Sequence, residues 1–312
     1  MKLHFIINEF AGNGKGKKVW EQFRKELNIS YTFHLTQYKE HAKEIAQQLG
    51  ETALSNGEKL LIIVVGGDGT IHEVLNGVKG FRNVFVGNIA AGSGNDFSRG
   101  YFSFRNAKEI EQLILKKECT YEQMDSGLLK INTTTQKSFI NNAGIGFDAF
   151  VANLANQSKL KKRLNSIGLG KLSYVYFLVY GLFKFKIFDL TVCIDGVERS
   201  YKNVWFVTLS NQPYFGGGMK ISPKSKPNDG ILELTLVHNL PRIKLLLLFV
   251  TVFFGAHTRL KAVVQTSAEN VKISVKEQIL CHTDGEIIKP LTKESTIEFD
   301  IQPKSWNLVN EK

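Results

Sequence analysis

This 312-residue chain contains three glycine-rich loops, and each loop directly follows a short apolar run. These loops constrain the fold more than any other feature. The apolar runs have the composition of strands buried in a parallel sheet, and helical patterns separate them. Alternating β and α segments with short connections predict a doubly wound parallel sheet. Ligands bind such sheets at the carboxyl ends of the strands, so the loops indicate one nucleotide site. The runs cover 2–8, 59–67 and 83–89, and the loops cover 8–18, 66–70 and 90–100.

The loops suit a phosphate group without matching a common nucleotide motif. Glycine lets an anion approach the backbone, and a helix that begins behind the loop offers N–H donors. Gly12 stands four residues before Gly16 and two lysines follow, so the G-x-x-x-x-G-K-[ST] pattern is absent, as is G-x-G-x-x-G. Asp68, in the second loop, can bind a metal, hold a metal-bound water or act as a base. An aspartate that only caps the helix would have the same local sequence.

The alternation of β and α segments ends after about residue 118. From Tyr121 onward, β-type stretches alternate with polar turns. We therefore expect an α/β domain with a parallel sheet over 1–120 and a mainly antiparallel, β-rich domain over 121–301. The tail 302–312 is a candidate to pack back on the first domain.

Two helix-like segments of the second domain, at about 148–186 and 241–256, are rich in apolar residues. The run 245–256 has 12 residues, which is too few to span a bilayer, so it predicts a buried or interfacial helix. Basic side chains among Leu, Phe and Tyr in the first segment suit an anionic membrane surface. A core helix with snorkelling lysines is the alternative. Residues 149–188 hold seven Lys and Arg, at 159, 161, 162, 163, 171, 184 and 186, and no Asp or Glu.

Composition narrows the choice of partner and compartment. Lys and Arg number 40 against 29 Asp and Glu, and the net charge of +11 favours a nucleic acid, a nucleotide or an acidic membrane. No RNP, zinc-knuckle or helix-turn-helix pattern is present, so we expect no nucleic-acid partner. Cys119, Cys193 and Cys281 are far apart in the sequence and odd in number, and no C-x-x-C pair is present, so neither a disulfide framework nor a zinc site is indicated. The N-terminal residues lack a signal-peptide pattern, which favours the cytoplasm.

Four motifs together resemble the bacterial diacylglycerol kinase, or lipid kinase, family. They are N-x-x-A-G-x-G-x-G at 8–16, GGDGT at 66–70, GSGNDFSR at 92–99 and HTDGE at 282–286. The resemblance covers essentially the whole chain, although NAD kinases share GGDGT. It implies an ATP- and Mg²⁺-dependent kinase that phosphorylates a lipid alcohol, with diacylglycerol as the expected acceptor. A sphingoid base, another glycerolipid or NAD is the alternative acceptor.

The resemblance assigns the nucleotide to the three loops. The chain departs from the family where Glu9 and Phe10 follow Asn8 in place of the usual proline, and where Ser93 replaces a threonine but keeps the hydroxyl group. The expected nucleotide-binding residues are Asn8, Gly12, Gly14, Gly16, Thr36, Gly66, Gly67, Asp68, Gly69, Thr70, Glu73, Ser93, Asn95 and Asp96.

The resemblance also implies two Mg²⁺ sites. Asp68, Asp96 and Asp125 match acidic positions that act around the catalytic ion through water. The sequence around Asp125 is equally compatible with a simple turn cap, and P-N-D-G around Asp229 is a good turn sequence. The structural ion is expected on the side chain of Asp229 and the carbonyl groups of Lys226 and Ile231.

The late D-G-E segment matches the part of the family that carries the base. It assigns Glu286 as the proton acceptor for the lipid hydroxyl and Asp284 as its essential neighbour, although the two roles can be exchanged. Asp68 completes the expected catalytic set. T-D-G-E also reads as an ordinary hairpin turn. The active site is expected in the cleft between the two domains.

Two broader expectations follow from the resemblance. A kinase of a membrane lipid without a transmembrane segment would act peripherally, at the inner membrane surface, and relatives often form homodimers. A catalytically silent nucleotide-binding regulator is a further alternative, but all the acidic motif positions are present.

Overall fold

The computed structural model describes residues 1–115, 120–132, 135–158, 170–288 and 295–310. The chain forms two compact units, Met1–Asp125 with Pro303–Lys312, and Ser126–Gln302. Two long strands, β5 (Tyr121–Ile131) and β15 (Ser295–Val309), each begin in one unit and end in the other. Cys119 and the basic residues at 159, 161, 162 and 163 lie outside the described residues.

The first unit is built on a parallel sheet, as the alternating pattern predicts. Its strands lie in the order β2-β1-β3-β4, and each neighbouring pair is parallel. The end of β15 pairs in parallel with β4, where Asn307 lies opposite Phe85. The bounds are β1 Lys2–Ile7, β2 Thr32–Leu35, β3 Leu60–Gly66 and β4 Val84–Ala90.

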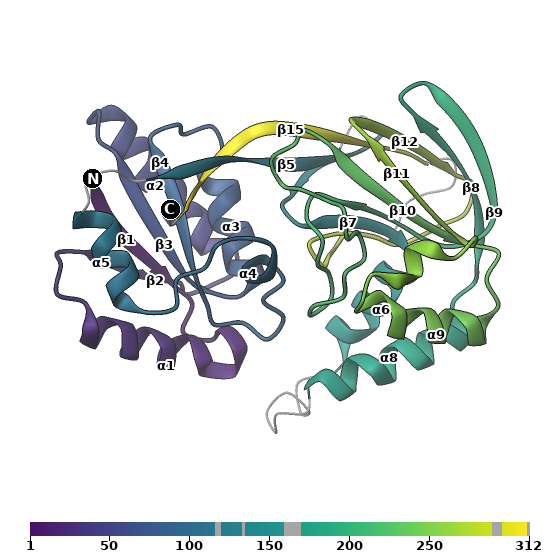
Figure 1. The fold of residues 1–312 in the computed structure, drawn as a ribbon, viewed down its shortest axis with the longest axis horizontal. Helices are drawn as coiled ribbons and strands as arrows, with labels where there is room; N and C mark the ends of the chain where they lie inside the picture. The colour runs from purple at the N-terminus through teal and green to yellow at the C-terminus, as the bar shows by residue number, and fades with distance from the viewer. Residues whose placement is uncertain (116–119, 133–134, 159–169, 289–294, 311–312) are drawn as a thin grey trace. The chain divides into compact units, whose positions relative to one another are not determined.

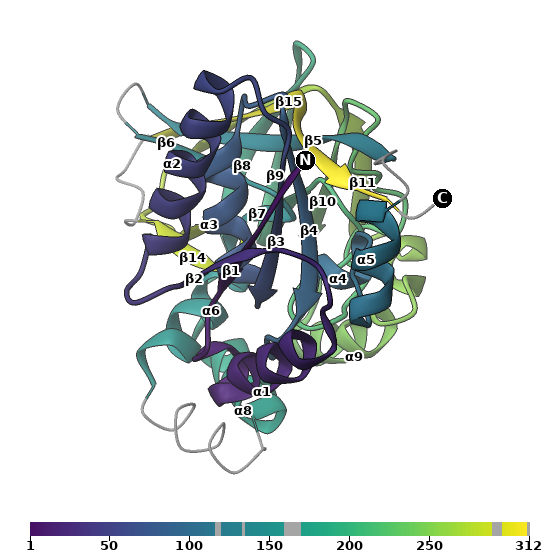
Figure 2. The ribbon, with the colours of Figure 1, turned by 90° about the vertical axis from the view of Figure 1, so that its left-hand side faces the viewer.

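Helices cover both faces of this sheet (Figure 2). Trp20 of α1 and Ile110 of α5 are buried against one face, together with Phe5 and Ile63. α2 and α3 contact each other and lie on the opposite side. Burial on both faces explains why the central strands read as continuous apolar runs. The helices are α1 Ala11–Glu26, α2 His41–Ser55, α3 Asp68–Val78, α4 Phe97–Gly100 and α5 Ala107–Leu115.

The second unit is β-rich and mainly antiparallel, which confirms the predicted fold class (Figure 1). The strands from β14 to β15 follow the order β14-β13-β7-β9-β8-β12-β15, with antiparallel neighbours. β10 pairs with β9 and β11, and β6 pairs with β5. The remaining bounds are β6 Thr135–Phe139, β7 Asn142–Gly146, β8 Phe188–Ile194, β9 Val197–Ser210, β10 Leu232–His238, β11 Val263–Ala268, β12 Asn270–Val275, β13 Cys281–Thr283 and β14 Glu286–Ile288.

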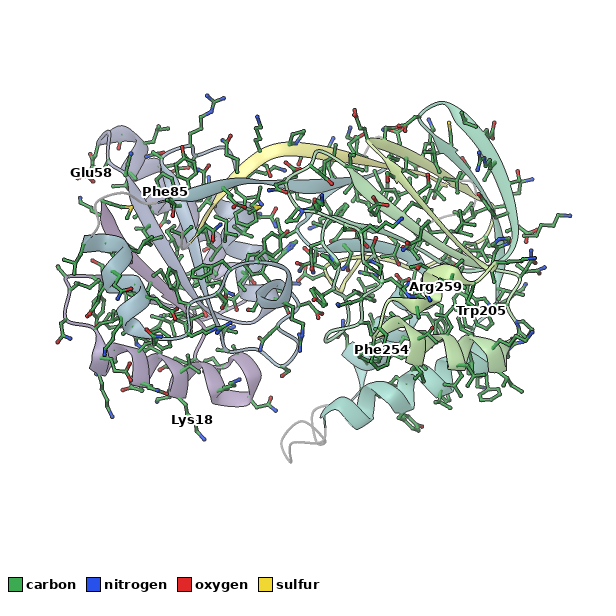
Figure 3. The ribbon with its side chains drawn as sticks, in the orientation of Figure 1. Lys18, Glu58, Phe85, Trp205, Phe254 and Arg259 are labelled. Carbon is green, nitrogen blue, oxygen red and sulfur yellow. The ribbon has the colours of Figure 1, made fainter. Side chains whose placement is uncertain are left out.

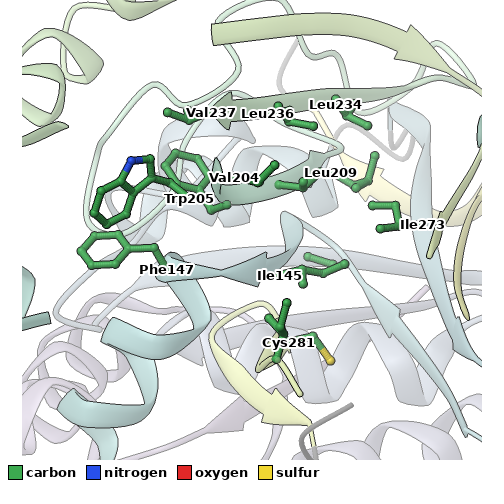
Figure 4. Packing of buried hydrophobic residues seen from close by; sticks show 14 of the residues in the cluster. Ile145, Phe147, Val204, Trp205, Leu209, Leu234, Leu236, Val237, Ile273 and Cys281 are labelled. Atoms are coloured by element: carbon green, nitrogen blue, oxygen red, sulfur yellow. The ribbon is translucent and has the colours of Figure 1, made fainter. Parts of the chain in front are cut away.

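Apolar side chains from strands and helices fill the core of the second unit (Figure 4). The ring of Phe147 meets Trp205 edge-on, with 5.5 Å between the ring centroids. The Nε1 of Trp205 donates a hydrogen bond to the carbonyl oxygen of Leu240 at 2.7 Å, so the polar edge of the buried indole is satisfied. The helices of this unit are α6 Phe147–Gln157, α8 Gly170–Lys184, α9 Arg242–Val252 and the 3₁₀ helix η1 Ala256–Arg259.

The two apolar segments of the second domain are helical, with shorter helices than their sequence pattern predicts. The segment 148–186 contains α6 and α8, and residues 159–169 between them lie outside the described part of the chain. The run 245–256 forms most of α9, which ends at Val252, and the turn behind it. Within the described residues, no helix has both the length and the apolar character that a membrane span requires.

Trp205 gives a test of this core. We expect Trp205→Ala to lower the free energy of unfolding by about 3–5 kcal/mol, because it leaves a cavity and an unpaired Leu240 carbonyl group. Phe183→Ala, at a position that is 67% exposed, should cost less than about 1 kcal/mol. Urea denaturation of the two variants measures the difference, and equal losses would contradict this packing.

Candidate functional site

A cleft of about 440 Å³ lies in the first unit, where the loops behind the parallel strands meet. It contains eight of the residues that the sequence predicts for nucleotide binding. The loop that follows β2 contributes Gln37, Tyr38 and Lys39 in addition to the predicted Thr36. The lining residues are Asn8, Phe10, Ala11, Gly12, Thr36, Gln37, Tyr38, Lys39, Gly67, Gly69, Thr70, Glu73, Gly92 and Ser93.

The loops can meet only because glycine stands where their backbones touch. A Cβ atom on Gly92 would lie 2.6 Å from the Cα of Gly67, and one on Gly12 would lie 2.4 Å from the carbonyl oxygen of Ala91. Gly12 also has a φ of +58°, which glycine adopts without strain. The backbone N–H of Ala91 donates to the carbonyl oxygen of Gly66 at 2.8 Å and joins the second loop to the third.

Side-chain hydrogen bonds tie the first loop to the start of α3. Asn8 donates through Nδ2 to Oγ1 of Thr70 at 3.0 Å, and its Oδ1 accepts the backbone N–H of Phe10 at 3.1 Å. Oε2 of Glu73 accepts the backbone N–H of Ala42 at 3.2 Å, which links α3 to α2. The first turn of α3, with Gly69 in the cleft, is a helix N-terminus that favours an anion.

Other predicted nucleotide residues support the loops without lining the cleft. A Cβ on Gly16 would lie 2.1 Å from the carbonyl oxygen of Asn8, and one on Gly66 would lie 2.7 Å from the Cβ of Thr70. Their role in the structure is therefore close packing. Gly14 has no such neighbour within 4 Å, and it supplies a positive φ before the regular part of α1. Asn95 also has a positive φ, of 55°, in the third loop.

Asp68 and Asp96 both lie beside Gly94. A Cβ atom there would lie 3.0 Å from Oδ2 of Asp68 and 3.9 Å from Oδ2 of Asp96, so glycine leaves room beside both carboxylates. Oδ1 of Asp68 accepts the backbone N–H of Phe97 at 2.8 Å, and Oδ1 of Asp96 lies 3.4 Å from Nη1 of Arg99. Carboxylate oxygens are the ligands that Mg²⁺ prefers, so this pair fits a hydrated ion. Among the described residues, no group of three or more His, Cys, Asp and Glu is placed to hold a metal directly.

The other two acidic side chains predicted to bind metal, Asp125 and Asp229, have local structural partners. Asp125 is buried, its Oδ1 accepts the backbone N–H of Lys304 at 2.8 Å, and its carbonyl oxygen accepts Nε1 of Trp306 at 3.1 Å. These bonds tie β5 to β15. Asp229 is exposed in the turn before β10, and its Oδ1 accepts the backbone N–H of Ile231 at 3.2 Å.

Asp284 in the second unit is held by three backbone N–H groups. Its Oδ2 accepts from Ile140 at 2.7 Å, and its Oδ1 accepts from Asn141 at 2.9 Å and Asn142 at 3.0 Å. These bonds engage both carboxylate oxygens and fix the turn between β13 and β14. Glu286 begins β14 on the other side of that turn.

A buried cluster that the sequence analysis missed supports the same turn. Nδ1 of His282 accepts the backbone N–H of Gly285 at 3.2 Å, so Nε2 carries the hydrogen and donates to Oδ2 of Asp148 at 3.1 Å. Thr208 donates through its hydroxyl to the same oxygen at 3.1 Å. Burial and the Asp148 carboxylate raise the pKa of the neighbouring Cys281 thiol to about 12, so this cysteine stays protonated and is no nucleophile.

Comparison with known proteins identifies both parts of the chain. Residues 2–126 match the model of the diacylglycerol kinase catalytic domain, and residues 141–309 match that of the YegS C-terminal NAD kinase beta sandwich-like domain. A Bacillus subtilis protein named "Putative lipid kinase YtlR" is 33% identical over 91% of this chain and 93% of its own length. A diacylglycerol kinase of Mycobacterium tuberculosis is 28% identical over 80% of this chain and 77% of its own.

A solved structure shares the fold. The crystal structure of "a putative diacylglycerol kinase" from Bacillus anthracis has a TM-score of 0.72 with 22% sequence identity, and the match covers 99% of this chain and 95% of that one.

The contact between Gly92 and Gly67 predicts that alanine destabilises the protein at position 92 but not at position 69. Gly92→Ala should lower the free energy of unfolding by about 1–3 kcal/mol, because its Cβ meets the backbone of Gly67. Gly69→Ala, in α3 with open space around its Cβ, should leave stability unchanged or raise it by up to about 1 kcal/mol. Chemical denaturation decides, and a stable Gly92→Ala protein would contradict the contact.

The His282 cluster predicts a graded loss of stability. His282→Ala removes a hydrogen-bond donor to the buried Asp148 carboxylate and leaves a cavity, so it should cost about 3–5 kcal/mol of unfolding free energy. Thr208→Val removes a single donor at similar volume and should cost about 1–2 kcal/mol. Denaturation curves compare them, and a smaller loss for His282→Ala than for Thr208→Val would refute this ranking.

Proposed function

Because the chain belongs to the diacylglycerol kinase catalytic-domain family of lipid kinases, we propose that it transfers the γ-phosphate of ATP to the hydroxyl group of a lipid alcohol. Diacylglycerol is the proposed acceptor, and phosphatidic acid and ADP are the products. The convergence of three glycine-dependent loops on one cleft carries the proposal.

The cleft has the size and lining that a nucleotide needs. Its volume of about 440 Å³ lies in the range of small-molecule sites. Phe10 and Tyr38 are exposed and line it, so their rings offer apolar surface to an adenine base. The N–H groups at the start of α3 suit the phosphates, and Lys39 adds a cation to the lining.

We propose Asp68 and Asp96 as the residues that hold the catalytic Mg²⁺ through water. The room beside their carboxylates at Gly94 supports this assignment. When Mg²⁺ is bound, it neutralises negative charge on the phosphate oxygens. Asp125 stays a predicted member of this set, and Lys226, Asp229 and Ile231 stay the predicted structural site.

We propose Glu286 as the proton acceptor and Asp284 as the residue that positions it. Asp284 uses both carboxylate oxygens to accept three backbone N–H groups, which supports a holding role. The hydroxyl oxygen of the lipid attacks the γ-phosphorus in line, and its proton passes to the carboxylate of Glu286 while the bond to the ADP oxygen breaks. Positioning and charge neutralisation supply most of the catalysis in such transfers.

The proposed acceptor resides in a membrane, so we propose a cytoplasmic enzyme that acts peripherally at the inner membrane surface. A homodimer remains a prediction from the resemblance.

Transfer of labelled γ-phosphate from ATP to diacylglycerol, a sphingoid base and NAD in mixed micelles tests the acceptor. Labelling of NAD alone would contradict the lipid assignment.

Variants of the acidic residues test their separate roles. Glu286→Gln should lower kcat at least about 100-fold and leave the KM for ATP unchanged, because it removes only the proton acceptor. Asp284→Asn should lower both kcat and stability, because it weakens the bonds that hold the turn. Glu277→Gln, at an exposed position, is the matched control. Full activity of Glu286→Gln would overturn its role as base.

A further inference from the structure

The outer face of α9 is apolar and uncovered. Leu245 and Leu248 are buried in the core of the second unit, as is Val252. Ile243, Leu247 and Val250 are exposed by 75%, 63% and 62%. Their spacing of four and three residues places them on one face of the helix.

Two phenylalanines continue this face beyond the end of the helix. Phe253 and Phe254 follow α9 directly and are exposed by 51% and 81%, and Figure 3 labels Phe254 next to the last turn. Water disfavours so many adjacent large apolar groups, and patches of this kind mark sites of interaction.

α8 has the same division between a buried and an exposed face. Phe177, Leu178 and Leu182 lie in the core that also receives α9, whereas Tyr176, Tyr180 and Phe183 are exposed. The rings of Tyr176 and Tyr180 stack, with 6.2 Å between their centroids. Both helices bury their inner faces in one core, so both outer faces point away from it (Figure 1).

Arg242 fastens the two helices together. This first residue of α9 donates through Nε to the carbonyl oxygen of Leu182 at 3.1 Å and through Nη2 to that of Phe185 at 3.3 Å. Its guanidinium group also lies 5.8 Å from the ring of Trp205. Arg242 thereby caps the end of α8, and its own charge is engaged in holding the pair.

The charged residues of the two segments that carry this surface are all basic, and the exposed Glu277 from outside them lines a pocket together with Lys184 and Lys186. Residues 170–186 and 241–262 contain no Asp or Glu. Lys184 and Lys186 follow the outer face of α8, Lys244 lies on α9, and Arg259 and Lys261 follow it. Two copies of the chain that met through this surface would bring like charges together, whereas an anionic lipid surface would complement them.

We propose that this α8–α9 face, made of Tyr176, Tyr180, Phe183, Ile243, Leu247, Val250, Phe253 and Phe254, docks the protein on an anionic lipid bilayer. α9 lies in the plane of the interface, and Phe253 and Phe254 enter the boundary between headgroups and acyl chains. The lysines contact anionic headgroups, each with a contribution of about fivefold in affinity. The proposal deepens the proposed function, because it names the surface through which the enzyme would reach its lipid acceptor.

Sedimentation of the full chain with vesicles tests the surface. We expect binding to vesicles of phosphatidylcholine with phosphatidylglycerol and at least about tenfold weaker binding to phosphatidylcholine alone. The combined variant Leu247→Ser, Val250→Ser, Phe254→Ser should bind anionic vesicles at least about tenfold more weakly than the wild type. Lys184→Gln with Lys244→Gln should remove most of the preference for anionic lipid. Leu54→Ser, on α2 of the first unit, replaces another exposed leucine and should change nothing.

A fluorescent reporter keeps the test independent of stability. The native Trp20, Trp205 and Trp306 are buried, so vesicles should not change their fluorescence. Phe254→Trp therefore adds one exposed indole whose emission reports on contact with lipid. Its emission should shift to the blue with anionic vesicles and stay unchanged without them. Absence of a shift, or equal binding by the wild type and the serine variant, would overturn the proposal. So would a serine variant that loses a dimer but keeps its vesicle binding, because the face would then join copies of the chain.

A soluble acceptor separates this proposal from the proposed function. The serine variant should lose activity toward long-chain diacylglycerol in vesicles and keep activity toward a short-chain, water-soluble diacylglycerol. Vesicle binding through α9 by a protein that phosphorylates neither lipid would support the surface and contradict the kinase assignment. Equal loss on both acceptors with unchanged vesicle binding would contradict the surface.

Discussion

Direct backbone contact between loops is the constraint on which the candidate nucleotide site depends. Gly92 lies against Gly67, and Gly12 lies against the carbonyl group of Ala91, with no room for a Cβ atom at either glycine. Because the loops meet this closely, Asn8 can reach Thr70, and the start of α3 opens into the cleft. The parallel sheet brings the loops to the same edge, and glycine lets them touch.

In the second unit, hydrogen bonds to buried polar groups, and not close contacts at glycine, hold the acidic residues in place. Buried polar groups need partners, and the turn between β13 and β14 satisfies several of them at once. Asp284 accepts three backbone N–H groups, while His282 joins Gly285 to Asp148. The turn that carries Glu286 is therefore fixed from both sides, which would hold the proposed proton acceptor in one position.

The sequence indicates the site more completely than it indicates the role of each residue. Three loops at strand ends could be predicted, but Gly16 and Gly66 serve packing, and the tertiary contacts that decide this are absent from a linear pattern. Residues 37–39 were missed because β2 is short and largely exposed, although the strand-end rule applies to them. The choice between Asp284 and Glu286 depends on hydrogen bonds to residues far away in the chain. From Leu245 to Val250 α9 is wholly apolar, so its sequence does not tell which side is buried.

We propose that the cleft of the first unit holds the ATP whose phosphate is transferred. A crystal structure of the protein with Mg²⁺ and a non-hydrolysable ATP analogue tests it most directly. We expect phosphate oxygens against the N–H groups at the start of α3, the base beside Phe10 and Tyr38, and the ion near Asp68 and Asp96. A nucleotide bound elsewhere, with this cleft left empty, would contradict it.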